Sequence, residues 1–252
     1  MRLEHQTTFD EARYRPVLSR QSDSPTLRDI WASAYGDEYP AEVEPLGFTT
    51  VSGLERVAAE LEVGPGETFV DLGCGRGGPG LWLARRTGAS VVGVDIVPEA
   101  VEQAARRSEQ FGVTDRASFL VGSFTSTGLP DAAFHGAVSI DSLWMVLDKS
   151  AAIEEVARIL SSGSRWVCTT WQPSYFDYAS LMTASGFAVL VCEEPSDWRA
   201  RQLAVYEGIV REERRLIAEL GDEAARVLLA EARDAPRMLD DCERLLIVVR
   251  RP

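Results

Sequence analysis

The sequence predicts an α/β protein built on one mostly parallel sheet. Short apolar runs alternate along the chain with segments whose apolar residues recur at helical spacing, the pattern of strands joined by helices. The run 91–95 is apolar up to its final acid, as expected of a strand buried on both faces of a sheet. An earlier run, 69–72, leads into the glycine-rich stretch 73–80 and then into a helix. Because glycine allows a backbone to approach a ligand closely, this strand, turn and helix predict a ligand site.

Composition limits the classes of function. The chain has 252 residues with 45% hydrophobic content, enough for one α/β domain with additions. Its net charge of -13 would repel a phosphate backbone, so a nucleic acid is not the expected partner. No apolar run approaches the ~20 residues that span a bilayer, and residues 1–5 contain no apolar signal core. We therefore expect a cytoplasmic protein with no membrane partner. Its four cysteines are well separated, and Cys168 and Cys192, which lie in apolar runs, are expected to be buried free thiols.

The N-terminal region, 1–50, is predicted to be a leader followed by a helical lid segment. Residues 1–23 are polar and aperiodic. Ser24 and Pro25 have the pattern of a helix N-cap and first helical position, and apolar residues then recur at i, i+3, i+4 and i+7. Tyr35, Tyr39 and Phe48 follow in a loop rich in glycine and proline. This aromatic segment either covers a pocket or packs outside the sheet, and the pattern leaves both interpretations open.

The core domain is predicted over 51–252. Ser52 and Glu55 have the spacing of a capping box for a helix that ends near Gly64. Helices are then expected up to Thr87, over 98–111, after Asp148 and over 175–185. Two further helices within about 196–243 are expected to form a cap over the strand ends, where ligands bind in this type of sheet. The predicted strands are 69–72, 91–95, 119–122, 136–140, 165–171, 188–192 and 245–249.

Two acids determine how the glycine-rich turn is interpreted. The spacing Gly73-x-Gly75-x-x-Gly78 matches the dinucleotide fingerprint, which would suit a nicotinamide cofactor. However, Asp71 precedes the first glycine by two positions, where a carboxylate would repel a pyrophosphate and attract a cation. Asp95 ends the next strand about 20 residues later, where an acid reaches the ribose hydroxyls of an adenosine ligand. The structural alternatives are a tight turn without a ligand and, for Asp95, a helix N-cap.

The segment Asp71-Leu72-Gly73-Cys74-Gly75 resembles motif I of the class I S-adenosylmethionine-dependent methyltransferases, and the resemblance extends over about residues 50–252. It implies a Rossmann-like seven-stranded sheet whose last strand is antiparallel between the fifth and sixth. It also implies that Asp71, Gly73, Cys74 and Gly75 hold the methionine end of the cofactor and that Asp95 holds the ribose. The adenine is assigned to residues that follow the next two strands: Ile96, Phe124 and Ser123, the last at a position where relatives often carry an acid.

Within this superfamily the chain looks similar to the UbiE/sterol-type small-molecule branch, which is common in bacterial natural-product pathways. Those relatives usually read Ser-x-Glu-Ser-Leu-His-His after the fourth strand, whereas this chain reads Ser-Ile-Asp-Ser-Leu-Trp-Met over 139–145. Trp144 and Met145 replace the histidine pair, a natural general base. Asp141 is the remaining candidate base, although it could instead structure the loop or touch the cofactor. The aromatic residues expected to contact an apolar substrate are Tyr35, Tyr39, Trp144, Trp171 and Tyr175.

The expected function is transfer of the methyl group of S-adenosylmethionine to a small, largely apolar metabolite through a carbon, nitrogen or oxygen acceptor. Without the usual base, alignment of the reacting atoms would supply most of the rate. No metal is expected, because the Asp-Asn cluster of catechol-type relatives does not follow the fourth and fifth strands. One alternative is a cyclase or scaffold that binds the cofactor without transferring its methyl group. The other is an NAD(P)-dependent oxidoreductase.

Overall fold

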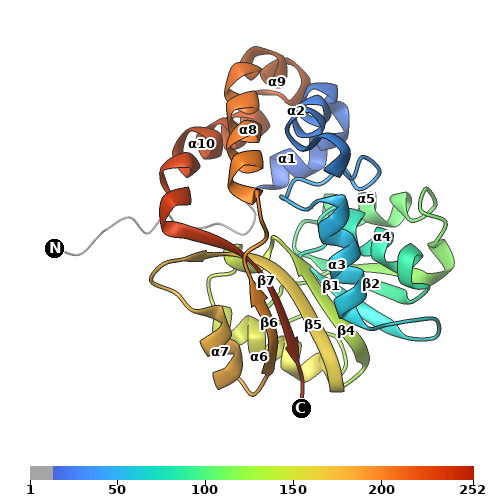
Figure 1. Ribbon diagram of the computed structural model, residues 1–252. Helices are drawn as coiled ribbons and strands as arrows, with labels where there is room; N and C mark the ends of the chain where they lie inside the picture. Colours follow the sequence, from blue (N-terminus) through green and yellow to red (C-terminus); the bar gives the residue numbers. More distant parts are fainter. Residues whose placement is uncertain (1–13) are drawn as a thin grey trace.

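A seven-stranded sheet organises residues 14–252, the part of the chain that the computed structural model describes (Figure 1). The strand order is β3-β2-β1-β4-β5-β7-β6, and every pairing is parallel except those of β7 with β5 and β6. The predicted mostly parallel sheet, with its last strand antiparallel between the fifth and sixth, is therefore confirmed. The strands are β1 (Thr68–Leu72), β2 (Ser90–Asp95), β3 (Ala117–Val121), β4 (Phe134–Ile140), β5 (Leu160–Pro173), β6 (Ala188–Glu193) and β7 (Cys242–Arg250).

The strand order places a switch point beside β1. The chain passes from β1 outward to β2 and β3, and then returns to β4 on the other side of β1. Because connections leave on opposite sides there, a crevice forms at the carboxyl ends of these strands. Asp71 lies near the end of β1, Asp95 ends β2, and Asp141 directly follows β4, so the three acids come to one edge of the sheet.

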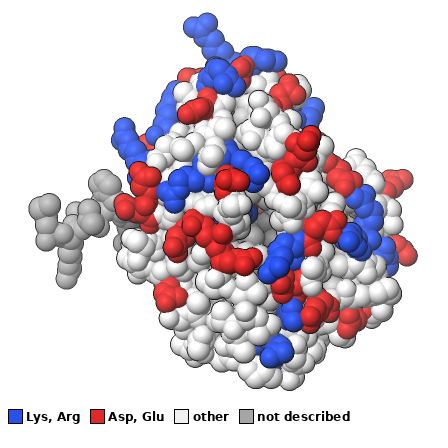
Figure 2. Space-filling view, in the orientation of Figure 1, with Lys and Arg blue, Asp and Glu red and all other residues white. Residues whose placement is uncertain are grey.

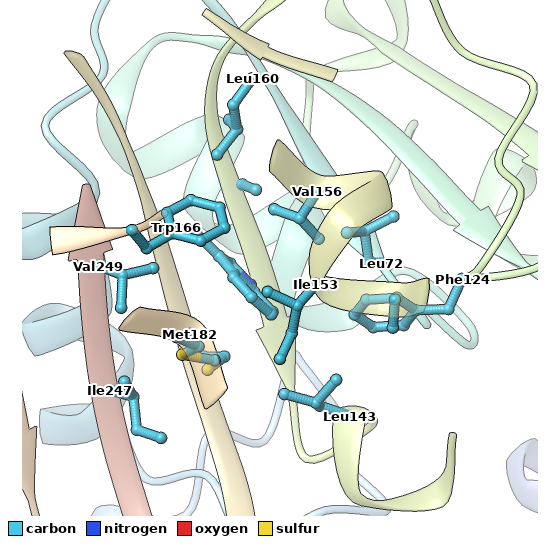
Figure 3. Packing of buried hydrophobic residues seen from close by; sticks show 14 of the residues in the cluster. Leu72, Phe124, Leu143, Ile153, Val156, Leu160, Trp166, Met182, Ile247 and Val249 are labelled. Atoms are coloured by element: carbon cyan, nitrogen blue, oxygen red, sulfur yellow. The ribbon is translucent and has the colours of Figure 1, made fainter. Parts of the chain in front are cut away.

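Helices cover both faces of the sheet. Alternate residues of β1 point to opposite sides: Val70 and Leu72 belong to one hydrophobic cluster and Phe69 to another. The first cluster packs residues of α6 and α7 against Trp166 of β5 (Figure 3), and the second packs α3 and α4 on the other face. The helices that flank the sheet are α3 (Val51–Leu61), α4 (Gly78–Thr87), α5 (Pro98–Arg107), α6 (Lys149–Ile159) and α7 (Tyr178–Ala184).

A helical cap lies above the carboxyl ends of the strands (Figure 1). Its helices share a third hydrophobic cluster, which joins the N-terminal segment to the segment between β6 and β7. The cap consists of α1 (Arg15–Arg20), α2 (Pro25–Tyr35), α8 (Trp198–Arg211), α9 (Glu213–Leu220) and α10 (Asp222–Asp234). The late segment thus contains three helices where two were expected, because the chain turns at Glu212, which ends α8 and begins α9.

Several local predictions need correction. The leader predicted over 1–23 is wrong from residue 15 onward, because α1 forms there and buries Val17 completely; residues 1–13 lie outside the described part. Such a short helix has too few apolar residues to show periodicity and is stabilised by the cap around it. The N-cap at Ser24 is confirmed, since its hydroxyl accepts a bond from the Leu27 N–H. The capping box at Ser52 is wrong: Thr50, whose backbone is extended, caps α3 by accepting from the Gly53 N–H at 2.9 Å.

Candidate functional site

A cavity lies between the sheet edge and the helical cap. Its floor includes the glycine-rich turn after β1 together with Asp71 and Asp95. Its wall on the β4 side includes Asp141 and Trp144. Its roof comes from the cap and from the loop after α2, through Trp31, Phe48, Tyr206, Glu231 and neighbouring residues. The cavity therefore joins an acidic floor to a largely aromatic roof.

The glycine-rich turn allows the backbone to line this cavity. Gly73 has φ +71°, and a Cβ there would lie 2.5 Å from the Ser142 Cβ, so a larger residue would clash. The Gly73 and Cys74 N–H groups both donate to the Val94 carbonyl, at 2.8 and 3.1 Å, and this anchors the turn on β2. Gly75 has φ +50° and directs its N–H to Asp95 at 2.8 Å. Burial raises the pKa of the Cys74 thiol, which keeps it neutral.

Asp71 is a buried acid that takes a backbone hydrogen bond from Gly80 but has one oxygen without a partner among the described residues. Its residue is 2% exposed, and its Oδ2 has no hydrogen-bond partner among residues 14–252. A Cβ on Gly80, in the first turn of α4, would lie 2.4 Å from this oxygen, so glycine makes room for the carboxylate. Burial, and secondarily the charge of Asp95, raises the pKa of Asp71 to about 7. An incoming cation would stabilise the ionised form, so the floor suits an ammonium or sulfonium group.

Asp95 fixes the turn and also lines the cavity. Its Oδ2 accepts from the Gly75 N–H at 2.8 Å, and its Oδ1 accepts from the Val97 N–H at 2.9 Å. Burial raises its pKa. Asp95 is not the N-cap of α5, because Val97 occupies that position. Since each carboxylate oxygen can accept more than one bond, Asp95 retains acceptor capacity toward a ligand hydroxyl.

The residues predicted to contact adenine lie away from the cavity lining. Phe124 is 5% exposed and packs in the core beside Leu72 and Ile153 (Figure 3), with its ring 6.4 Å from that of Trp166. Its assignment to the ligand is therefore withdrawn, because the ring packs among the apolar residues under α6. Ile96 and Ser123 are half-buried beyond the ends of β2 and β3, and the Ser123 hydroxyl lies 3.0 Å from that of Thr125.

Asp141 is fully engaged by protein groups. Arg244 of β7 donates hydrogen bonds to its carboxylate from Nε at 3.1 Å and from Nη2 at 2.9–3.0 Å. The Thr169 hydroxyl donates to it at 2.9 Å, and the Phe48 N–H donates at 2.8 Å. Asp141 also has φ +54°, a left-handed backbone that these contacts hold in place. The geometry favours the loop-structuring role over that of a general base, and Asp141 ties the roof segment at Phe48 to the sheet.

Two of the predicted substrate aromatics form part of one aromatic cluster. Trp144 lines the cavity, stacks on Trp171 with a ring-centroid distance of 5.8 Å, and donates its Nε1–H to the Asp141 carbonyl at 2.8 Å. Trp171 lies behind Trp144 and also contacts Phe48 at 5.8 Å. Phe48 in turn meets Tyr206 at 6.1 Å. These contacts give the β4 wall and the roof a continuous aromatic surface.

The other three predicted aromatics lie elsewhere. Tyr175 is 88% exposed, because β5 continues to Pro173 and carries the following turn away from the cavity, so its assignment to the substrate is wrong. Tyr35 is buried and lines a second, neighbouring pocket together with Arg244. Tyr39 is half-buried against the cap cluster.

The structure also brings in residues that the sequence did not single out. Glu231 of α10 lines the cavity and accepts hydrogen bonds from the Tyr206 hydroxyl of α8, at 2.9 Å, and from the Tyr14 hydroxyl. Burial, and then the charge of Glu231, raises the pKa of Tyr206. Tyr206 was recognisable only as one member of an apolar helix face, and no local pattern marked Glu231.

Two arginines hold the N-terminal segment over the glycine-rich turn. Arg76 bonds to Gln103 at 2.7 Å and pairs with Glu44 at 3.3 Å. Arg107 donates to the carbonyls of Arg76 and Val43, both at 3.0 Å, and burial lowers its pKa to about 10. These contacts fix the loop at Val43 and Glu44 beside the glycine-rich turn.

On the face in Figure 2, acidic and basic side chains are interspersed and form no continuous basic surface. Among the described residues, no helix is long and apolar enough to cross a membrane.

Comparison with known proteins finds a methyltransferase domain within the core. A methyltransferase-domain model matches residues 69–163. Methyltransferase GfsG of Streptomyces halstedii is 32% identical over 126 residues, which are 50% of this chain and 45% of that protein. The 27-O-demethylrifamycin SV methyltransferase of Amycolatopsis mediterranei is 30% identical over 143 residues, 55% of this chain and 52% of that protein. The chain thus spans about half the length of these curated relatives.

Solved structures share the fold over a larger part of the chain. The [4+2]-cyclase SpnF superposes with a TM-score of 0.70 at 23% identity, covering 79% of this chain and 80% of its own. A geranyl diphosphate methyltransferase in complex with S-adenosylmethionine superposes with a TM-score of 0.62 at 21% identity, covering 87% and 94%. At this identity the likeness concerns the fold alone. Residues 69–163 thus contain a methyltransferase domain, and the sheet order and the buried acid beside the glycine-rich turn are those expected of the class I S-adenosylmethionine-dependent methyltransferase superfamily.

Proposed function

We propose that this chain transfers the methyl group of S-adenosylmethionine to a small, largely apolar metabolite. The observation that carries the proposal is Asp71, a buried carboxylate whose Oδ2 has no partner among the described residues, beside a turn that only glycine can form. A buried polar atom without a partner is costly, and a cationic ligand removes that cost. The methionine end of the cofactor carries such a cation.

The chain's own groups divide the work of holding the cofactor. We assign the ammonium group of its methionine end to Asp71 and its ribose hydroxyls to Asp95. The backbone of Gly73, Cys74 and Gly75 is assigned to approach the methionine end closely. When bound, S-adenosylmethionine supplies an electrophilic methyl group on a sulfonium. The protein's further contribution is to orient an acceptor toward that methyl group and to exclude water, and a closed aromatic roof suits both tasks.

The substrate half of the cavity is apolar and aromatic. Trp31, Phe48, Trp144 and Tyr206 present rings to it, which fits a largely apolar ligand. The cavity volume is about 160 Å³, below the roughly 300–1,000 Å³ of typical ligand pockets. The similarity to methyltransferase GfsG and to a 27-O-demethylrifamycin SV methyltransferase supports a role in bacterial secondary metabolism.

One alternative has a specific observation in its favour. SpnF is a [4+2]-cyclase, and it shares this fold. The histidine pair of related methyltransferases is absent here, and Asp141 is occupied by Arg244. These facts are compatible with a protein that binds the cofactor and catalyses a cyclisation. Incubation with methyl-labelled cofactor and an extract of the producing cell distinguishes the two: a product heavier by one methyl supports transfer, and an isomeric product with unconsumed cofactor supports the cyclase.

Ligand binding tests the proposal more directly. Calorimetric titration is expected to show binding of S-adenosylmethionine and S-adenosylhomocysteine and no binding of NAD(P)H. Tight NAD(P)H binding without S-adenosylhomocysteine binding would refute the proposed function in favour of an oxidoreductase.

A further inference from the structure

A second pocket lies behind one wall of the first cavity. Its lining comes from the end of α2, from α3, from the start of α8 and from strands β5, β6 and β7. Phe48 and Thr49 line both spaces and so form part of their common wall. The volume of the second pocket is about 390 Å³, within the roughly 300–1,000 Å³ of typical ligand pockets. It is therefore large enough for a small molecule of its own.

Two buried side chains bring unused hydrogen-bond donors to this pocket. Tyr35 is 5% exposed, and its hydroxyl makes no hydrogen bond among residues 14–252. Arg244 is 4% exposed and gives its Nε and Nη2 to Asp141, whereas its Nη1 makes no hydrogen bond in the same part of the chain. Because both residues line the pocket, an acceptor atom of a ligand can take up these donors there.

Arg201 of α8 adds a cation beside them. Its guanidinium forms no ion pair or hydrogen bond within the described residues, and it lies over the Tyr35 ring, 5.9 Å from the centroid. Burial raises the pKa of the Tyr35 phenol, while the nearby charges of Arg244 and Arg201 act in the opposite direction. The phenol thus keeps its proton and can donate it in a hydrogen bond, and the three groups converge on one part of the pocket.

The acids of the pocket limit the charge that it can accept. Glu38 accepts from the Ser52 N–H at 2.9 Å and from its hydroxyl at 2.8 Å, bonds that lower its pKa, as does the more distant charge of Arg201. Glu193 pairs with Arg56 at 3.6 Å. Both carboxylates would repel a doubly charged phosphate about twice as strongly as a singly charged group. The charge balance therefore favours a ligand with a single negative charge.

We propose that the second pocket binds a small carboxylic acid, whose carboxylate lies between Arg201, the free Nη1 of Arg244 and the Tyr35 hydroxyl. Guanidinium groups match a carboxylate in geometry, and hydrogen bonds between charged groups are the strong ones. Trp198 and Leu246 line the same pocket and would contact an apolar body. This site goes beyond the proposed function, because it does not depend on how the first cavity is used.

The binding mode leaves the wall between the two spaces intact. A ligand on Nη1 of Arg244 does not displace Asp141, which holds Nε and Nη2 of the same guanidinium. Asp141 in turn keeps its hydrogen bond from the Phe48 N–H. The acid should therefore bind equally well with the first cavity empty or occupied.

The test compares acids with neutral analogues of the same shape. The pairs are 3-phenylpropionate with 3-phenylpropionamide and benzoate with benzamide, each titrated by calorimetry into the full chain at pH 8. We expect the acid of at least one pair to bind about ten- to a hundredfold more tightly than its amide. Its affinity should change by less than about threefold when S-adenosylhomocysteine is present at saturation. Phenyl phosphate, doubly charged at this pH, should bind more weakly than the preferred acid.

Three variants locate the binding site. Arg201→Gln should bring the affinities for acid and amide within about threefold of each other. Tyr35→Phe removes only the hydroxyl, so the acid should bind about tenfold more weakly while the midpoint of urea unfolding stays unchanged. Arg211→Gln is the control: Arg211 lies on the same helix and pairs with Glu212 at 3.5 Å, but it does not line the pocket. That variant should keep the preference for the acid.

The possible results separate the site from its alternatives. The proposal is overturned if neither acid is preferred over its amide in the wild type, or if Arg201→Gln keeps the preference. Competition between the acid and S-adenosylhomocysteine would place the acid in the first cavity and equally refute the second site. Tighter binding of phenyl phosphate would replace the carboxylate by a phosphate. The wild-type comparisons decide the matter even if a variant does not fold.

Discussion

Replacing Asp71 with asparagine should make the ligand-free protein more stable at high pH. The pKa of Asp71 is about 7 in the folded chain, raised from 3.8 chiefly by burial. Between these values the folded state keeps the proton that the unfolded state has released, so the stability of the wild type falls as pH rises. Below about pH 4 the carboxyl is protonated in both states, and Asp71→Asn should have little effect there. Above about pH 7 the buried carboxyl is ionised, and the full free-energy cost of burying its charge is present. The asparagine variant avoids this cost.

The size of the effect follows from the two pKa values. A shift of about 3 units corresponds to about 4 kcal/mol of free energy of unfolding at pH 8. Burial of the group justifies the full conversion, since little solvent screens it. The same substitution should have the opposite effect on ligand affinity. Asp71→Asn should weaken S-adenosylhomocysteine binding at pH 8, because the amide cannot neutralise the ammonium group of the ligand.

Urea denaturation of both proteins at pH 5 and pH 8, without ligand, measures the difference. Asp177→Asn is a control of opposite sign, because bonds from Ser180 lower the pKa of Asp177 at the N-cap of α7. That variant should be less stable than the wild type above pH 4. If Asp71→Asn shows the same pH dependence as the wild type, Asp71 is ionised in the folded protein, and the argument from its burial is wrong.

Four further outcomes are expected. Asp95→Ala should weaken S-adenosylhomocysteine binding by about 1–3 kcal/mol in calorimetry, since it removes charged acceptors for hydroxyls; an unchanged Kd in a folded variant would make Asp95 purely structural. Asp141→Asn should lower the free energy of unfolding in urea by about 3–5 kcal/mol, because Arg244 is left buried without its counter-charge; full stability with lost turnover would instead identify a base. Trp144→His should change the pH profile of turnover, and an unchanged profile would place Trp144 away from the reacting centre. A chelator should leave turnover intact, and a loss restored by magnesium would contradict a metal-independent reaction.

The core of the fold could be predicted from the sequence because its signals are local. A strand buried on both faces is a continuous apolar run, and a turn with positive φ requires glycine within a few positions, so β1, β2 and the turn at Gly73 were recognisable. Asp71 and Asp95 stood out because their distances from those glycines along the chain are fixed by the strand–turn–helix unit. Their joint presence at one sheet edge follows from parallel pairing.

The roof of the site depended on contacts that no local pattern encodes. Arg244 meets Asp141 across 103 positions, and Glu231 meets Tyr206 across 25, because separate segments converge over the strand ends. Which face of α10 turns toward the cavity is decided by the packing of the whole cap, whereas the packing of α6 on the sheet buries Phe124 in the core. The sequence alone therefore determined the floor of the cavity, where spacing along one strand–turn–helix unit sets the geometry. Only the tertiary structure decided the roof, where side chains distant in sequence must meet.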